Sequence, residues 1–174
     1  GNIIVENALI LEAGSLSIEA FTLQLNGDLM YEGGSLSGGS LSVLSIGGDG
    51  GMVTLEPVVL HTLMLNRTNG LSLSGNVEVQ HMFVLFKGPV FRNGFEMYGP
   101  SSTLCYQGNI MQQTTDEEFP AAQGPKNLVI ANPSQVVLHD ERTVSGNLEL
   151  RMGQFVFSDQ TLHLGGTIVA IMGN

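Results

Sequence analysis

The residues that could perform chemistry in this chain of 174 residues are few and scattered. Four histidines are present, together with a single cysteine, Cys105, in the segment Thr-Leu-Cys-Tyr-Gln-Gly. A catalytic thiol needs a base beside it, and nothing in the sequence places one near Cys105. We therefore interpret Cys105 as an inert thiol. A single cysteine also excludes an internal disulfide.

Two of the histidines have an informative spacing. His81 follows His61 at the same step that separates position 3 from position 23, whereas His139 and His163 have no such partner. If that step is one structural repeat, His61 and His81 stack in one column, where two neutral imidazoles about 5 Å apart could hold a metal ion. A metal site needs a third or fourth ligand, and the sequence indicates none. We interpret the pair as a solvated polar column in which two protonated rings would repel each other.

The acidic residues offer two calcium candidates. Asp49 lies in Gly-Gly-Asp-Gly-Gly at 47–51, similar to part of a calcium-binding β-roll repeat, but that motif works by repetition and occurs here once. Asp116, Glu117 and Glu118 form the only acidic run, which could bind calcium loosely. We expect a flexible turn at the first position and a solvated loop at the second.

Sugar hydrolases and lyases need clustered carboxylates with a basic residue on one exposed face. Asp140, Glu141 and Arg142 are the nearest candidates, and Asp159 is isolated. Neighbouring residues on a strand point to opposite faces, so this run does not build a site. We assign no catalytic, cofactor-binding or metal-binding residue, and we expect neither a cofactor nor enzymatic activity.

The composition excludes several classes of protein. Six basic residues against 16 acidic ones give a net charge of −10, which argues against nucleic-acid binding. No apolar run reaches the roughly 18 residues of a membrane-spanning helix, so we expect no membrane insertion. Charged residues make up 13 % of the chain where about 25 % is usual, although 43 % of the residues are hydrophobic. We expect one domain over residues 1–174.

The chain repeats itself at two shifts. At a shift of 20, the segment 3–17 aligns with 23–37, and both end in Glu-x-Gly-Ser-Leu-Ser. At a shift of 65, the segment 63–90 aligns with 128–155. The longer shift is about three times a unit of roughly 21–22 residues, so both shifts agree on the coil length expected of a stacked repeat. Apolar and polar residues alternate within each unit, which predicts short strands.

Two folds fit alternating strands in such units. Three Asn-Gly pairs, at 26–27, 69–70 and 93–94, favour the tight hairpins of an antiparallel sandwich or barrel. A parallel β-solenoid instead stacks equivalent residues about 4.8 Å apart in successive coils, which explains the column matching that hairpins do not need. We predict an all-β parallel β-solenoid of about eight coils of roughly 20–22 residues, with an insertion loop at 111–126.

Residues 103–150 resemble a repeat of large secreted bacterial surface proteins. The pattern is Tyr-x-Gly, a Gln-Thr step, a loop, Asn-Leu-x-Ile-x-Asn, and then Val-x-Leu and Gly-x-Leu-x-Leu coils. Such repeats look like filamentous-haemagglutinin-type and autotransporter-type β-helices, and they occur in giant surface proteins of Bacteroidota-like bacteria. The resemblance implies this fold and an extracellular, cell-surface location, and it transfers no catalytic residue. The matching positions are Tyr106, Gly108, Gln113, Thr114, Asn127, Leu128, Ile130, Asn132, Val136, Leu138, Gly146, Leu148 and Leu150.

The expected function is structural, as a segment of an adhesin shaft, stalk or filament. The chain begins at Gly1 without a signal peptide, starts in mid-pattern at 3–5 and becomes apolar again over 168–172. We therefore expect further coils of the same chain or other subunits at the solenoid ends. Host or surface glycans are a further candidate partner. The alternative function is a carbohydrate-active or carbohydrate-binding β-helix.

Overall fold

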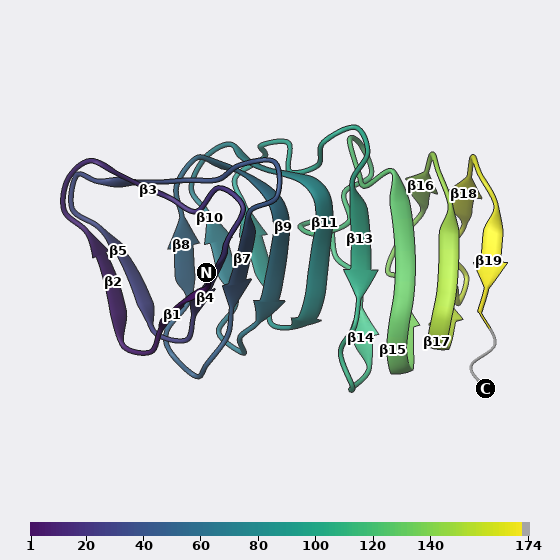
Figure 1. The fold of residues 1–174 in the computed structure, drawn as a ribbon. Helices are drawn as coiled ribbons and strands as arrows, with labels where there is room; N and C mark the ends of the chain where they lie inside the picture. Colours follow the sequence, from purple (N-terminus) through teal and green to yellow (C-terminus); the bar gives the residue numbers. More distant parts are fainter. Residues whose placement is uncertain (172–174) are drawn as a thin grey trace.

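The computed structural model describes residues 1–171 and is a parallel β-solenoid of about 8 turns (Figure 1). Strands lie side by side along the long axis, from β1 in the first turn to β19 at the last described rung. Each full turn of the solenoid contributes strand segments to at most three rows. A row is a set of strands from successive turns that stack along the axis. The predicted fold class is confirmed. The hairpin alternative is wrong, because every strand pair among the described residues is parallel.

The register of the first row explains the sequence echoes. Leu63 pairs with Phe83, so positions at a shift of 20 are neighbours in one column. Leu63 and Leu128 lie three rungs apart, which produces the echo at 65. The turn from Leu104 to Leu128 is the longest, because it carries the insertion. The row runs through β1 (Ile3–Val5), β4 (Thr22–Leu25), β7 (Val43–Ile46), β9 (Val58–Asn66), β11 (Val77–Lys87), β13 (Thr103–Tyr106), β15 (Asn127–Val137), β17 (Leu148–Val156) and β19 (Ile168–Ala170).

The other two rows are interrupted. The second row contains the separate pairings β2 with β5, β8 with β10 and β12, and β14 with the second half of β15. Its own strands are β2 (Ala8–Leu11), β5 (Asp28–Tyr31), β8 (Val53–Leu55), β10 (Leu71–Leu73), β12 (Val90–Arg92) and β14 (Gln112–Gln113). The third row contains β3 (Ser15–Ser17), β6 (Ser35–Ser37), β16 (Arg142–Val144) and β18 (Leu162–Leu164), together with the first halves of β9 and β11.

Alternation along each strand builds one continuous core. In β4, Leu23 and Leu25 point inward and are fully buried, whereas Thr22 and Gln24 are partly exposed. Burying a Leu side chain completely contributes about 1.5–3 kcal/mol, and the same column is filled in turn after turn. Outward positions are often Ser, Thr, Asn or Gln, which can stack at the rung spacing without the like-charge repulsion that Asp or Lys would cause.

A buried arginine joins the corners of three successive turns. The guanidinium of Arg67 is fully buried and donates hydrogen bonds of 2.7–3.4 Å to the carbonyl oxygens of Leu25, Gly27, Gly47 and Gly51. An arginine carries five N–H donors in a fixed plane, so one side chain can satisfy carbonyl groups from two neighbouring turns at once.

The glycine-rich turn around Asp49 is therefore shaped by Arg67. A Cβ atom added to Gly50 would lie 3.0 Å from Arg67 Nη1, so the missing side chain gives the guanidinium room. Burial lowers the pKa of Arg67, and the charges of Asp28 and Asp49 partly oppose this effect. The carbonyl oxygens of Gly47 and Gly51 on either side of Asp49 are both hydrogen bonded to Arg67.

Candidate functional site

The long turn after β13 folds part of its acidic run into the solenoid. Phe119 is fully buried in the main core, and Glu118 beside it is only 2 % exposed. The expectation of a solvated loop is wrong at Glu118, although Asp116 in the same run is exposed. A buried carboxylate needs hydrogen-bond donors, so the residues that donate to Glu118 determine how this segment is held in the fold.

Donors surround Glu118. The Tyr106 hydroxyl donates to Oε1 at 2.8 Å, the Thr115 N–H donates to the same oxygen at 2.7 Å, and Thr115 Oγ1 donates to Oε2. The Tyr98 hydroxyl donates to the backbone carbonyl of Glu118. Burial raises the pKa of Glu118, and the hydrogen bonds from Thr115 and Tyr106 offset part of this rise. Burial, followed by the charge of Glu118, raises the pKa values of both tyrosines.

A second buried cation lies beside this segment. Arg142 Nε donates to the carbonyl oxygen of Phe119 at 2.6 Å, and its Nη2 pairs with Asp116. Arg142 Nη1 lies 3.6 Å from an Asp140 carboxylate oxygen. Asp140 and Glu141 are exposed while Arg142 is buried. The sequence did not reveal that Asp116 returns from the preceding turn to complete a cluster, because the two segments are 26 residues apart.

This cluster has the outline of a hydroxyl, imidazole and carboxylate triad. Thr114 Oγ1 lies 2.6 Å from His139 Nδ1, and Asp116 Oδ1 lies 3.3 Å from His139 Nε2. Arg142 Nη2 is also within 2.6 Å of that Nε2. Nε2 therefore faces a guanidinium, which only donates, and a carboxylate, which only accepts.

Burial makes Thr114 a structural residue. Its Oγ1 accepts a hydrogen bond from the backbone N–H of His139 at 3.0 Å and lies 2.6 Å from Nδ1 of the same residue. Thr114 is also 1 % exposed, so a substrate has no access to its hydroxyl. We interpret Thr114, Asp116, His139 and Arg142 as a clamp that fastens the inserted segment to the next turn.

The structure places His61 and His81 in one column, as the spacing predicted. Their rings stack with centroids 4.5 Å apart and planes inclined by 23°. Burial, and then the charge of His81, lowers the pKa of His61. Within residues 1–171, no group of three or more His, Cys, Asp or Glu side chains could hold a metal ion.

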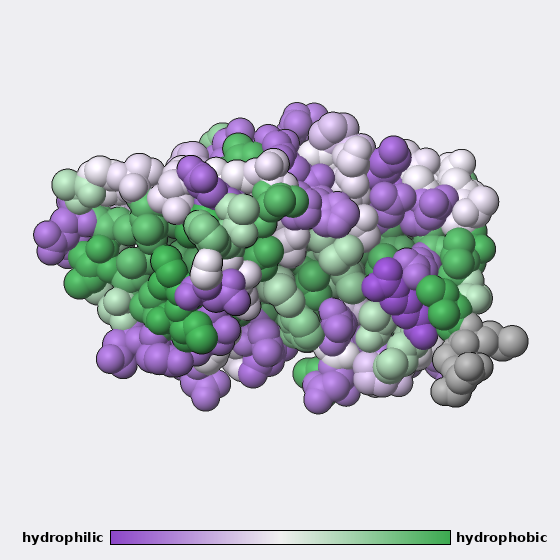
Figure 2. Space-filling model, in the orientation of Figure 1, coloured by the Kyte–Doolittle hydropathy of each residue, from purple (hydrophilic) through white to green (hydrophobic). Residues whose placement is uncertain are grey.

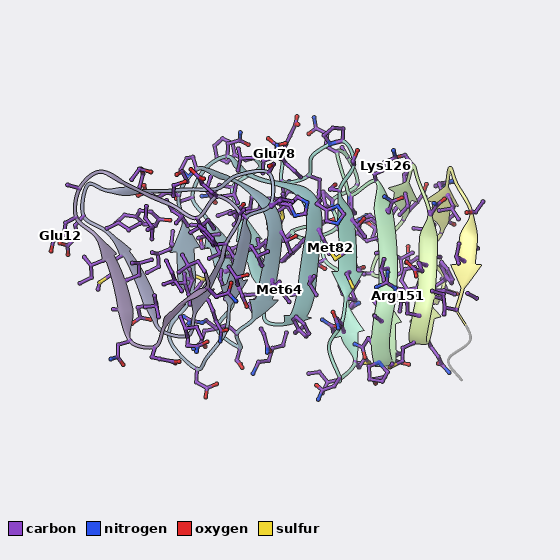
Figure 3. The ribbon with its side chains drawn as sticks, viewed as in Figure 1. Glu12, Met64, Glu78, Met82, Lys126 and Arg151 are labelled. Atoms are coloured by element: carbon purple, nitrogen blue, oxygen red, sulfur yellow. The ribbon has the colours of Figure 1, made fainter. Side chains whose placement is uncertain are left out.

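Cys105 points to the outer face of the first-row sheet but is covered there. It packs with Val84 and Val129 in a small apolar cluster flanked by Met64 and Met82, which lie on that face in Figure 3. Burial raises the pKa of the Cys105 thiol to about 11. At neutral pH the thiol is therefore protonated and a poor nucleophile.

A concave opening lies where the second row is interrupted. A cavity of about 390 Å³ separates β12 from β14, and a second cavity of about 290 Å³ adjoins it and shares Phe86, Lys87 and Ile110. Phe91, Ile110 and Met111 make the outer wall apolar and exposed. Sequence reasoning missed this groove, because it arises from a break in strand pairing and not from a motif.

The fold defines the chain as a parallel β-solenoid repeat protein. No protein-family model, curated protein or solved structure matches it. No helix in the described part of the chain is long and apolar enough to cross a membrane.

Proposed function

We propose that this chain is a structural, non-catalytic segment of an extracellular β-solenoid, such as an adhesin shaft or a filament. The observation that carries the proposal is the pair of open edges in the first-row sheet. β1 and β19 are its outermost described strands, and each has a neighbour on one side alone. An open strand edge presents unpaired N–H and C=O groups that another strand can join.

The side chains at both edges support this role. Ile3 on β1 is 44 % exposed and Ile168 on β19 is 62 % exposed, although the interior rungs of the same inward column are buried. Figure 2 shows hydrophobic surface gathered over the first turns and again near β19. Further coils of the same chain, or another subunit, would bury these groups. Met172, part of the apolar run of the sequence, lies outside the described residues.

The location at a bacterial cell surface rests on the sequence resemblance of residues 103–150. Stacked rungs transmit tension through many parallel hydrogen bonds, which suits a stalk.

The test is the association state of the isolated chain, measured by light scattering after size-exclusion chromatography over a range of concentrations. We expect concentration-dependent multimers that Ile4→Lys or Val169→Lys suppresses, because a charge at an edge strand blocks pairing. Val59→Lys is the matched control: Val59 is similarly exposed but lies on a middle turn. A wild-type chain that stays monomeric at every concentration contradicts the proposal.

A further inference from the structure

The second row of the solenoid is broken between two successive turns. Among the described strands, β12 pairs with β10 alone and β14 pairs with β15 alone, so both are edge strands. They occupy equivalent positions in neighbouring turns, each following its first-row strand, β11 or β13. Between the two turns, the backbone bond from the Gln107 N–H to the Leu85 carbonyl, 2.9 Å long, precedes the break.

A side-chain hydrogen bond lies at each side of the break. The amide Nε2 of Gln112 donates to the Leu85 carbonyl oxygen at 3.3 Å. On the other side, the Arg92 N–H donates to Glu117 Oε2 at 2.7 Å. The space between these two bridges is the cavity of about 390 Å³. Its size falls within the range of about 300–1,000 Å³ that is typical of small-molecule sites.

The walls of this groove are mainly apolar. Val90 forms part of the buried side, while Phe91, Ile110 and Met111 are 49 %, 62 % and 60 % exposed around the opening. Large apolar side chains that remain exposed around a concave site mark a surface suited to an apolar ligand. An unbranched hydrocarbon chain fits such walls, because it needs no hydrogen-bonding partner.

The lining of the groove carries one cation, Lys87, and two carboxylates, Glu117 and Glu118. Glu117 accepts the Arg92 N–H, and both oxygens of Glu118 accept hydrogen bonds from Tyr106 and Thr115, so both carboxylates have partners inside the protein. Lys87 lines both adjoining cavities. Within residues 1–171 it forms no ion pair, in contrast to the buried Arg67 and Arg142.

We propose that the groove between β12 and β14 binds a medium-chain fatty acid. The hydrocarbon chain lies against Phe91, Ile110 and Met111, and the carboxylate pairs with the ammonium group of Lys87. This inference does not depend on the shaft function, because the groove lies in mid-solenoid and away from the open edges.

The test measures decanoate binding by calorimetry, below the concentration at which decanoate forms micelles. A charge-assisted hydrogen bond contributes about 1.5–3 kcal/mol, so Lys87→Gln should weaken binding about tenfold or more. Lys87→Arg should bind like the wild type, since it keeps the cation. Lys126→Gln is the matched control, because Lys126 is the other lysine of the chain and does not line the groove.

Two further ligands and one further variant separate the contribution of the ligand's carboxylate from that of its hydrocarbon chain. Decanol, which keeps the chain but lacks the charge, should bind about tenfold more weakly than decanoate. Met111→Asp should weaken decanoate binding without unfolding the chain, because Met111 is exposed. An apolar peptide with a free C-terminal carboxylate should bind more weakly than decanoate. Absence of decanoate binding, equal binding of decanol, equal losses in Lys87→Gln and Lys126→Gln, or tighter binding of the peptide would overturn the proposal.

Discussion

Arg67 determines the shape of a whole corner with one side chain. Its guanidinium occupies a place that water would otherwise need to fill, and four backbone carbonyls converge on it. Nothing in the local sequence Asn-Arg-Thr signals burial, since most arginines are exposed. The glycines at 47–51 could be recognised in the sequence. The sequence did not show that this turn packs against the guanidinium of Arg67.

Replacing Arg67 by Met should strongly destabilise the chain. The substitution leaves the carbonyl oxygens of Leu25, Gly27, Gly47 and Gly51 without their donor, and breaking a buried charged network costs about 3–5 kcal/mol. Urea unfolding measures the change. Arg151→Met is the control: Arg151 is half-exposed and pairs with Glu149, so its loss should cost less than about 1 kcal/mol. Equal effects would show that Arg67 does not join the turns.

Glu118 gives the chain a defined pH dependence. Burial raises its pKa in the folded state above the value in the unfolded chain. The protonated form is therefore favoured by folding, so Glu118 contributes stability below its unfolded pKa that is lost as the pH rises through the folded pKa.

Glu118→Gln tests this sign, because Gln resembles the protonated acid and does not titrate. The free energy of unfolding of the wild type, relative to the variant, should fall between about pH 4 and about pH 7. Urea unfolding of both proteins at the two pH values gives the difference. A relative stability that stays constant or rises with pH would contradict the assignment of a burial-dominated shift.

At the scale of elements, the strands were predictable and the inserted segment was not. Period-two alternation and the column matches at the two sequence shifts specify parallel rungs, because both follow directly from stacking. The run Asp116-Glu117-Glu118 resembles a solvated loop in every property that a sequence displays. Within this run, Glu118 is buried against Tyr98 and Tyr106, and the exposed Asp116 pairs with Arg142. These three partners come from other segments of the chain.

Turn glycines are a testable part of this element pattern. Gly88 and Gly94 both have positive φ, at 99° and 80°, but their surroundings differ. A Cβ atom on Gly88 would lie 1.9 Å from the Arg67 carbonyl oxygen, whereas one on Gly94 would meet nothing within 4 Å.

Gly94→Ala should therefore cost only the backbone strain of about 1–2 kcal/mol. Gly88→Ala should cost more, by roughly 1–3 kcal/mol, because a neighbouring turn must move. Thermal and urea unfolding of the two variants supply the comparison. If Gly94→Ala is as damaging as Gly88→Ala, close approach between turns is not what requires glycine at position 88.

At the scale of the whole molecule, the solenoid is a stack whose two end strands continue the residue columns of the interior rungs. Ile4 on β1 and Val169 on β19 occupy the same outward column of the first-row sheet. If a second copy adds head to tail in register, these two positions become neighbouring rungs about 4.8 Å apart. This distance is within the range of Cα separations, about 4.4–6.8 Å, that a disulfide can bridge.

The most direct test of this central claim is therefore covalent trapping. Ile4→Cys and Val169→Cys are combined in a Cys105→Ser background, oxidised under mild conditions and analysed by non-reducing electrophoresis and mass spectrometry. We expect a ladder of multimers linked between positions 4 and 169, which neither single cysteine variant forms. A double variant that remains monomeric after oxidation, or that links only like positions, would contradict head-to-tail stacking of the solenoid ends.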